Sequence, residues 1–299
     1  TNDNTVDLTI TAATGSVIRV YDGSTLLGIA AEGTGLNAGT YTLTTSPLAD
    51  GPHTITATAT DAVGNVSSAS TAVAFSVDTT PPAAPTLSLN SDSGSSSSDG
   101  ITSANTVNVS GLEPGASWQY STDGGSSWSN GTGTTFTLSA GQNTYQVRQT
   151  DAAGNVSGVS DAVVYTLDTA GPTVTISDDR SGTTNGLITY TITFSEAVTG
   201  FEASDLTVAN GTKGAFTKLS DTTYTLVVTP DASAEGNVTV DIAANAAKDL
   251  AGNNSSAATQ SVQPFDTLAP TAPVVTQPTT PTNDNTVDLT ITAATGSVI

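Results

Sequence analysis

The sequence contains no cysteine, a single histidine and only six basic residues among its 299. Without cysteine, the chain can form neither disulfides nor thiolate metal sites. The lone histidine, His53, excludes a multi-histidine metal centre, and we interpret it as a solvated residue at the start of a strand. The 27 acidic residues give a formal net charge of −21 at pH 7. So acidic a chain is repelled by phosphate groups and anionic lipid, which excludes nucleic-acid partners.

Long apolar runs are absent too, so no membrane insertion is expected in this segment. Among the acids, 22 are aspartate and 5 are glutamate. Aspartate is typical of turns and of oxygen-ligand metal sites, whereas glutamate is typical of helix surfaces. Together with abundant threonine, 28 glycines and 13 prolines, this composition predicts an all-β protein.

Repeats organise the chain. Residues 1–18 recur unchanged at 282–299, an offset of 281 residues. Within this unit, an Asp-x-x-Gly-Asn loop occurs three times, and 17 residues after each of its aspartates a second aspartate opens a Pro-containing linker. The loops begin at Asp61, Asp151 and Asp249, and the linkers begin at Asp78, Asp168 and Asp266. The linker aspartates are 90 and 98 residues apart, which indicates three domains per unit.

Alternating apolar and polar residues predict about seven short strands in each of these domains. Alternation such as Val6, Leu8 and Ile10 against Thr5, Asp7 and Thr9 is found throughout. The prediction is a tandem array of immunoglobulin-like β-sandwiches, elongated and without disulfides. The expected domains are 1–80, whose opening strand is missing, 81–169, 170–268, and an incomplete fourth domain at 269–299 that copies the first.

The three loops and three linkers resemble the bacterial immunoglobulin-like repeats of giant extracellular adhesins, including biofilm-associated and type I-secreted proteins. The segments Thr193–Gly211 and Trp118–Trp128 are similar to two subtypes of these repeats. The resemblance covers essentially the whole chain. It implies an extracellular, bacterial cell-surface location, a stalk function in cell adhesion or biofilm formation, and calcium at the junctions between domains.

Sandwich topology provides a mechanism for such junctions. The Asp-x-x-Gly-Asn loop lies between the last two strands and faces the preceding domain, whereas the linker aspartate ends the last strand and faces the following one. Clustered carboxylates repel each other unless a hard cation such as Ca²⁺ bridges them. Acids of the loop after the first strand add further ligands. The predicted calcium ligands are Asp61, Asn65, Asp78, Asp92, Asp99, Asp151, Asn155, Asp168, Asp178, Asp179, Asp249, Asn253 and Asp266.

Simple turn chemistry is the alternative for these motifs, because Asp, Gly and Asn are also preferred in hairpin turns. An Asp-box-like segment, Ser121 to Trp128, predicts a tight hairpin with Trp128 packed on the sandwich. No catalytic cleft is indicated, so we expect a non-enzymatic stalk whose partners are the neighbouring domains of the same chain. A surface, glycan or protein ligand of the full-length protein is a further candidate partner. The alternatives are a glycan- or protein-binding module and a subunit of a self-assembling filament or surface layer.

Overall fold

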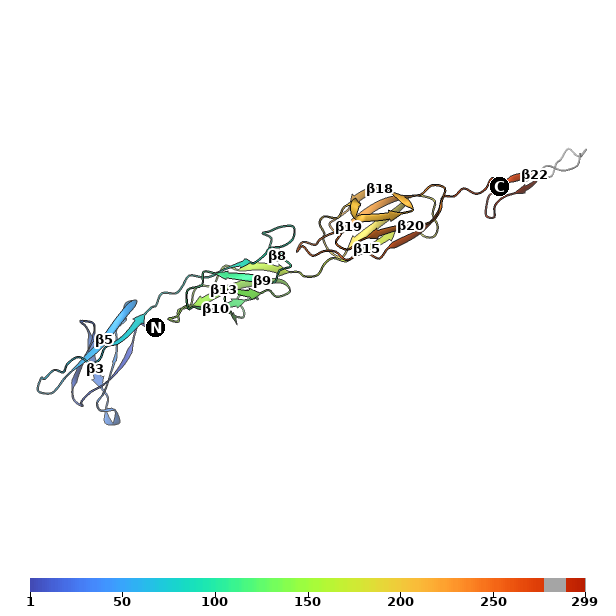
Figure 1. Ribbon diagram of the computed structural model, residues 1–299. Helices are drawn as coiled ribbons and strands as arrows, with labels where there is room; N and C mark the ends of the chain where they lie inside the picture. Colours follow the sequence, from blue (N-terminus) through green and yellow to red (C-terminus); the bar gives the residue numbers. More distant parts are fainter. Residues whose placement is uncertain (277–288, 299) are drawn as a thin grey trace, which may run out of the picture. The chain divides into compact units, whose positions relative to one another are not determined.

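The computed structural model describes residues 1–276 and 289–298. This part of the chain consists of β-strands joined by turns, with two one-turn 3-10 helices. It divides into two compact units, one of residues 1–92 and 104–167, the other of residues 93–103 and 168–299. Figure 1 shows the strands of both units, coloured from the N-terminus to the C-terminus. In the described part, no helix has the length and apolar character needed to cross a membrane.

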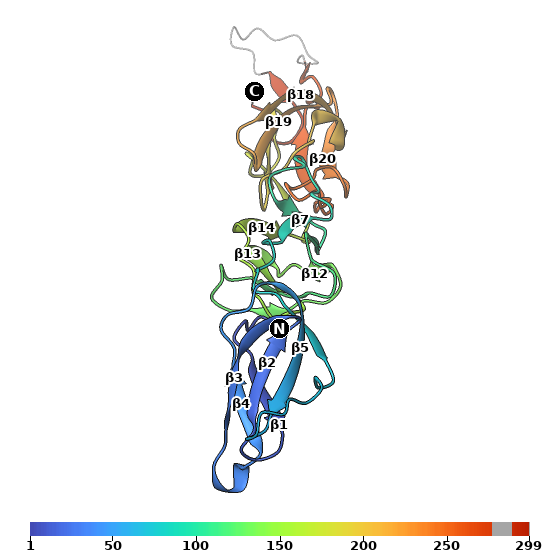
Figure 2. The same ribbon diagram turned by 90° about the vertical axis from the view of Figure 1, so that its left-hand side faces the viewer.

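The first sandwich lies in the first unit, and its strands β2, β3, β4 and β5 run alongside one another (Figure 2). Its sheet order is β1-β4-β3-β2-β5-β6, and β3 joins the two layers by pairing with both β2 and β4. The elements are β1 (Asp7–Thr11), β2 (Val17–Asp22), β3 (Thr25–Glu32), the 3-10 helix η1 (Gly35–Asn37), β4 (Thr40–Thr44), β5 (Gly51–Thr60) and β6 (Val73–Val77).

The second sandwich, also in the first unit, has two separate sheets. One has the order β12-β9-β7, and the other contains β11, β10, β13 and β14 in that order. The elements are β7 (Thr86–Leu89), β9 (Thr106–Ser110), β10 (Ser117–Ser121), β11 (Ser129–Asn130), β12 (Thr135–Thr137), β13 (Gly141–Thr150) and β14 (Val163–Leu167). Its core is aromatic, with Trp118, Phe136 and Tyr145 buried between the sheets.

A buried glutamine ties three segments of the second sandwich together. The side chain of Gln149, on β13, is fully buried. Its amide nitrogen donates to the carbonyl oxygens of Ala83 (2.7 Å) and Gly111 (2.9 Å). Its amide oxygen accepts the backbone N–H of Glu113 at 2.9 Å. One side chain therefore satisfies three backbone groups of the linker and of the turn after β9.

The third sandwich lies in the second unit and has the largest core, which includes Tyr190, Ile192 and Leu226. Its sheets have the orders β15-β16-β19-β18 and β17-β20-β21. The elements are β15 (Val174–Asp178), β16 (Ile188–Phe194), the 3-10 helix η2 (Ala203–Asp205), β17 (Leu206–Ala209), β18 (Gly211–Lys218), β19 (Thr223–Pro230), β20 (Glu235–Ile242) and β21 (Ser261–Asp266). The unit also contains β8 (Ile101–Thr102) and the pair β22 (Val274–Thr276) and β23 (Thr290–Thr292).

These observations confirm the predicted fold class, all-β immunoglobulin-like sandwiches in tandem without disulfides. The alternation read from the sequence matches the observed faces of the strands. On β16, for example, Ile188, Tyr190 and Ile192 are fully buried, while Thr189 and Thr191 between them are partly exposed. The expected incomplete fourth domain at 269–299 lies partly outside the described residues.

Candidate metal centre

The three Asp-x-x-Gly-Asn loops share one set of hydrogen bonds. In the first loop, the Asp61 carboxylate accepts the backbone N–H of Asn65 at 2.8 Å and its side-chain amide at 2.9 Å. The Asp61 N–H in turn donates to the Asn65 carbonyl oxygen at 3.0 Å. The same three contacts recur in the other loops, between Asp151 and Asn155 and between Asp249 and Asn253.

Glycine closes each of these turns in the left-handed region, which other residues rarely adopt. Gly64, Gly154 and Gly252 have φ values of 92°, 105° and 93°. Hydrogen bonds from the asparagine side chains are the largest cause that lowers the pKa values of the Asp61 and Asp151 carboxyls. The turn chemistry considered for this motif is therefore present in all three copies. One carboxylate oxygen of Asp61 and of Asp151 already accepts two or three backbone N–H groups, whereas the other oxygen accepts only the asparagine side chain and keeps a lone pair for a cation.

In two copies, the asparagine also holds the linker. Asn155 donates its side-chain N–H to the carbonyl oxygen of Asp78 at 2.8 Å, within the first unit. Asn253 makes the equivalent bond to the carbonyl oxygen of Asp168 at 2.9 Å, within the second unit. The structure thus brings each of these linker aspartates to the loop with which it was predicted to associate. The contact that it shows is a hydrogen bond from the asparagine side chain to the linker backbone, and metal binding by these residues stays a prediction.

Replacement of Asn155 by alanine is expected to weaken the attachment of the linker. The substitution leaves the Asp78 carbonyl without this donor and removes one bond to Asp151, at a cost of about 1–2 kcal/mol in unfolding free energy. Asn65→Ala is the matched control, because Asn65 makes the same bond within its loop and is exposed. Urea unfolding of both variants measures the difference. Equal losses in the two variants would show that the bond to Asp78 contributes nothing.

Three carboxylates come together in the second unit. Ligand oxygens of Asp168, Glu196 and Asp249 lie within 4.8 Å of one another, the one cluster of this kind among the described residues. Asp168 follows β14, Glu196 lies two residues after β16, and Asp249 begins the third loop. Asp249 is only 1% exposed, and the other two are partly buried.

The cluster is electrostatically strained at neutral pH. Burial raises the pKa of the Glu196 carboxyl, and the negative charges of Asp168 and Asp249 raise it further. Asp249 already accepts two hydrogen bonds from Asn253, and Asp168 accepts the N–H of Ala170 at 3.0 Å. Hard carboxylate oxygens from three positions are the donors that Ca²⁺ prefers, with water completing its shell of 6–8 ligands.

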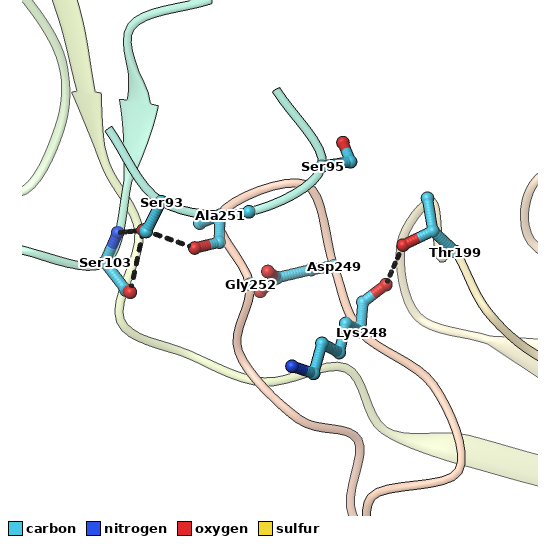
Figure 3. A pocket seen from close by; sticks show the side chains of 9 residues that line it. Ser93, Ser95, Ser103, Thr199, Lys248, Asp249, Ala251 and Gly252 are labelled. Carbon is cyan, nitrogen blue, oxygen red and sulfur yellow. Dashed lines mark hydrogen bonds between the residues drawn. The ribbon is translucent and has the colours of Figure 1, made fainter. Parts of the chain in front are cut away.

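A pocket of about 300 Å³ in the second unit adjoins this cluster and includes Asp249 in its lining. Figure 3 shows Asp249 between two hydrogen-bonded contacts that shape the pocket. On one side, the Ser93 hydroxyl donates to the Ala251 carbonyl oxygen at 2.6 Å. On the other, Thr199 and the backbone of Lys248 pair with each other. The pocket wall is mainly polar, which suits a hydrated ion better than an apolar ligand.

Other predicted ligands lie elsewhere. Asp92 belongs to the first unit, whereas Asp99 belongs to the second and accepts the N–H of Ile101 at 3.0 Å. Neither joins the cluster. At the opposite end of the third sandwich are Asp178, Asp179 and Asp266, whose carboxylates each accept a local backbone N–H. In the described structure, these three do not meet the distance that unites the Glu196 cluster.

Glu196 was not predicted from the sequence. In the sequence, Glu196 belongs to the segment Thr193–Gly211. That segment was interpreted only through its similarity to one subtype of the bacterial repeats. The turn after this strand and the Asp-x-x-Gly-Asn loop lie at the same end of a sandwich. An acid in that turn could therefore have been placed beside Asp249 from topology alone.

The interpretation of His53 as solvated is wrong. It is 9% exposed, with Nδ1 2.6 Å from an Asp22 carboxylate oxygen and Nε2 2.7 Å from the Ala49 carbonyl oxygen. The side-chain hydrogen bond with Asp22 is the main cause that raises the pKa of His53. Asp22 comes from β2 and His53 from β5, and the sequence separation between them concealed the pair.

The segment from Ser121 forms the tight hairpin that was predicted. The Asp123 carboxylate accepts the Ser121 hydroxyl and both the N–H and the hydroxyl of Ser127. The bonds from Ser127 lead the causes that lower the pKa of Asp123 to about 2. Trp128 is partly buried, and the guanidinium of Arg148 lies 4.3 Å from its ring centroid.

The fold and its repeated loops define a tandem immunoglobulin-like protein. A family model described as a bacterial Ig-like domain matches residues 1–79 and again 80–169, and a second model of the same description matches residues 168–264. The chain belongs to the family of bacterial Ig-like domains. No curated protein matches it.

Several solved structures are similar to the chain. A tetra-tandem repeat in the extending region of a large adhesion protein shares 24% identity over 98% of this chain and 79% of its own, with a TM-score of 0.28. The fibronectin(III)-like modules of Clostridium thermocellum CbhA share 16% identity over 54% of this chain and 85% of theirs, with a TM-score of 0.30. The human desmocollin-1 ectodomain shares 11% identity over 85% of this chain and 52% of its own, with a TM-score of 0.25.

Proposed function

We propose that the chain is a non-enzymatic extender segment of a bacterial surface adhesin, stiffened by calcium where linkers meet the following sandwich. The extracellular placement and the role in adhesion or biofilm formation belong to this proposal. The observation that carries it is the convergence of Asp168, Glu196 and Asp249, because one residue of the three comes from the linker. An ion shared by a linker and a loop restrains the linker.

The donor set fits calcium on chemical grounds. Three carboxylates supply negative charge, and Asp249 is held in place by Asn253 before any ion arrives. Calcium relieves the repulsion among the three carboxylates, so part of the binding energy comes from charge neutralisation. The bond from Asn253 to the Asp168 carbonyl positions the linker in advance. Calcium binding therefore has to order little of the linker, and its entropic cost is small.

Titration calorimetry with CaCl₂, after treatment of the protein with chelator, tests the proposal directly. We expect Asp168→Asn to weaken this site at least about tenfold, since one of three carboxylates is lost while its shape is kept. Asp61→Asn is the matched control, because Asp61 has the same loop geometry but is exposed. Equal affinities in Asp168→Asn and the unsubstituted protein would contradict the proposal.

Solution scattering tests the stiffening. With calcium, the maximum particle dimension should be larger and its distribution narrower than in chelator, because a bound ion restrains the linker at Asp168. Asp168→Asn should reduce this difference. Identical scattering profiles with and without calcium would contradict the proposed stiffening, even if the ion binds.

A further inference from the structure

The segment 93–103 belongs to a different compact unit from the strands that flank it in the sequence. It follows β7 and precedes β9, which are parts of the first unit, whereas the segment itself is part of the second. The backbone therefore passes from one unit to the other at three places, after residues 92, 103 and 167. Because ordering a chain segment costs conformational entropy, contacts within the second unit must hold this segment there.

A serine near the start of the segment joins it to the third Asp-x-x-Gly-Asn loop. The Ser93 hydroxyl donates to the carbonyl oxygen of Ala251 at 2.6 Å. The same hydroxyl oxygen accepts the backbone N–H of Ser103, at the other end of the segment, at 2.8 Å. Figure 3 shows both contacts. One hydroxyl group therefore holds the two ends of the segment together and fixes them to the loop.

Two glycines meet where the segment crosses the loop. Gly94 and Gly252 have φ values of 102° and 93°, in the left-handed region. A Cβ atom on Gly252 would lie 3.1 Å from both the Cα and the N of Gly94. A Cβ atom on Gly94 would overlap the carbonyl oxygen of Leu250. The two backbones are thus in direct contact, and a side chain at Gly94 has space only if they separate.

The segment also holds the linker. The N–H of Asp168 donates to the carbonyl oxygen of Thr102 at 3.0 Å, and Thr102 is 0% exposed. The Asp168 carbonyl oxygen in turn accepts the side-chain N–H of Asn253 from the loop. Segment, linker and loop are therefore bonded to one another in pairs. None of the three bonds that connect them involves a carboxylate, so none of them depends on a cation.

We propose that residues 93–103 form a strap that docks on the third loop and fastens it to the linker without a metal ion. The docking surface is the backbone of residues 250–252. There the Ala251 carbonyl oxygen accepts a serine hydroxyl, and the backbone beside it leaves space only for glycine. The partner that fits this surface is a Ser-Gly pair, which the chain supplies at Ser93 and Gly94.

The strap has a mechanical consequence. It is connected to the first unit at both of its ends, so its docking adds two covalent connections to the one that runs through the linker. Tension along the chain is then shared between the linker and the strap. This fastening persists when calcium is removed, and it is independent of the proposed calcium function.

Amide hydrogen exchange of the full chain in chelator, followed by NMR, tests the strap. The N–H groups of Ser103 and Asp168 are the reporters, because both are bonded to the strap. We expect Gly94→Ala to accelerate their exchange at least about tenfold, since the added methyl group forces the strap away from the loop. Gly115→Ala is the matched control, because Gly115 also has a positive φ, 80°, but a Cβ atom there would meet no heavy atom within 4 Å. Unchanged exchange in Gly94→Ala, or equal acceleration in both variants, would overturn the proposal.

A milder substitution tests the hydroxyl group separately. Ser93→Ala removes the bond to Ala251 and adds no bulk, so the fold is retained. We expect the exchange of the Asp168 N–H, which Ser93 does not contact, to become about two- to tenfold faster, as the loss of one hydrogen bond predicts. Ser97→Ala is the control, because Ser97 is an exposed serine in the middle of the same segment and should leave this rate unchanged. An unaltered rate at Asp168 in Ser93→Ala would contradict the assignment of Ser93 as the fastening residue.

Discussion

Calcium is expected to raise the melting temperature of the third sandwich by about 10–20 °C at a hundredfold excess over its dissociation constant. The basis is about 2.7 kcal/mol of added stability and about 4–8 °C per kcal/mol for a domain of this size. Glu196→Gln should roughly halve this increase, since a tenfold weaker site adds only about 1.4 kcal/mol at the same calcium concentration. Differential scanning calorimetry in calcium and in chelator measures both effects.

Without calcium, the same substitution should act in the opposite direction. Burial and the charges of Asp168 and Asp249 raise the pKa of Glu196, so the folded state binds its proton more readily than the unfolded state. The ionised side chain therefore destabilises the metal-free fold at neutral pH. Glu196→Gln should raise the melting temperature in chelator at pH 7, while it lowers the calcium response.

The pH dependence follows from the sign of this shift. In the metal-free protein, the contribution of Glu196 to stability becomes more favourable as the pH falls through its raised pKa towards the ordinary value of 4.5. The advantage of Glu196→Gln should therefore disappear below that value. Asp61 and Asp151 have lowered pKa values and oppose this trend in both proteins, so the comparison between them isolates Glu196.

Glu235→Gln serves as the control, because Glu235 is an exposed glutamate on β20 of the same sandwich. It should change neither the melting temperature in chelator nor the calcium response by more than about 1 °C, as expected for an isolated surface substitution. A Glu196→Gln protein with an unaltered calcium response would remove Glu196 from the site. A lower melting temperature of Glu196→Gln in chelator would show that the Glu196 carboxylate does not destabilise the metal-free fold.

Gln149→Leu is expected to destabilise the second sandwich by about 3 kcal/mol, since burying unsatisfied polar groups costs about 1–3 kcal/mol each. Leucine is similar in volume, so the substitution removes hydrogen bonds and creates little empty space. The groups left without this partner are the carbonyl oxygens of Ala83 and Gly111 and the N–H of Glu113. The loss corresponds to a melting temperature about 10–20 °C lower.

Gln142→Leu provides the comparison on the same strand, because Gln142 is exposed on β13. Urea unfolding followed by tryptophan fluorescence reports on this sandwich, since both tryptophans of the chain, Trp118 and Trp128, belong to it. A loss below about 1 kcal/mol in Gln149→Leu would mean that the freed backbone groups find water or other donors.

The fold was predictable because its strands are short and amphipathic. A period-two pattern such as that of β16 needs no knowledge of distant residues, and the recurring linkers divided the chain into regular segments. The local geometry of the Asp61, Asp151 and Asp249 loops was predictable for the same reason, since their hydrogen bonds span four residues.

Contacts between distant segments were harder to predict. Glu196 is 53 residues from Asp249, and Asp22 is 31 residues from His53, so neither pairing produces a local pattern. Gln149 is a polar residue in a buried position of β13, where alternation alone predicts an apolar one. His53 and Gln149 are buried because partners from other strands or loops satisfy them, whereas Glu196 is partly buried beside two other carboxylates.

The loop at Asp61 is exposed and still makes its full set of internal hydrogen bonds. Its conformation is therefore determined by its own residues. A domain with such a loop supplies the hydrogen bond to the preceding linker from its own residues. Unequal recombination between repeated gene segments, such as those encoding residues 1–18 and 282–299, can therefore add or delete whole domains without new interface mutations. A change in the number of repeats then needs no compensating substitution in the loops.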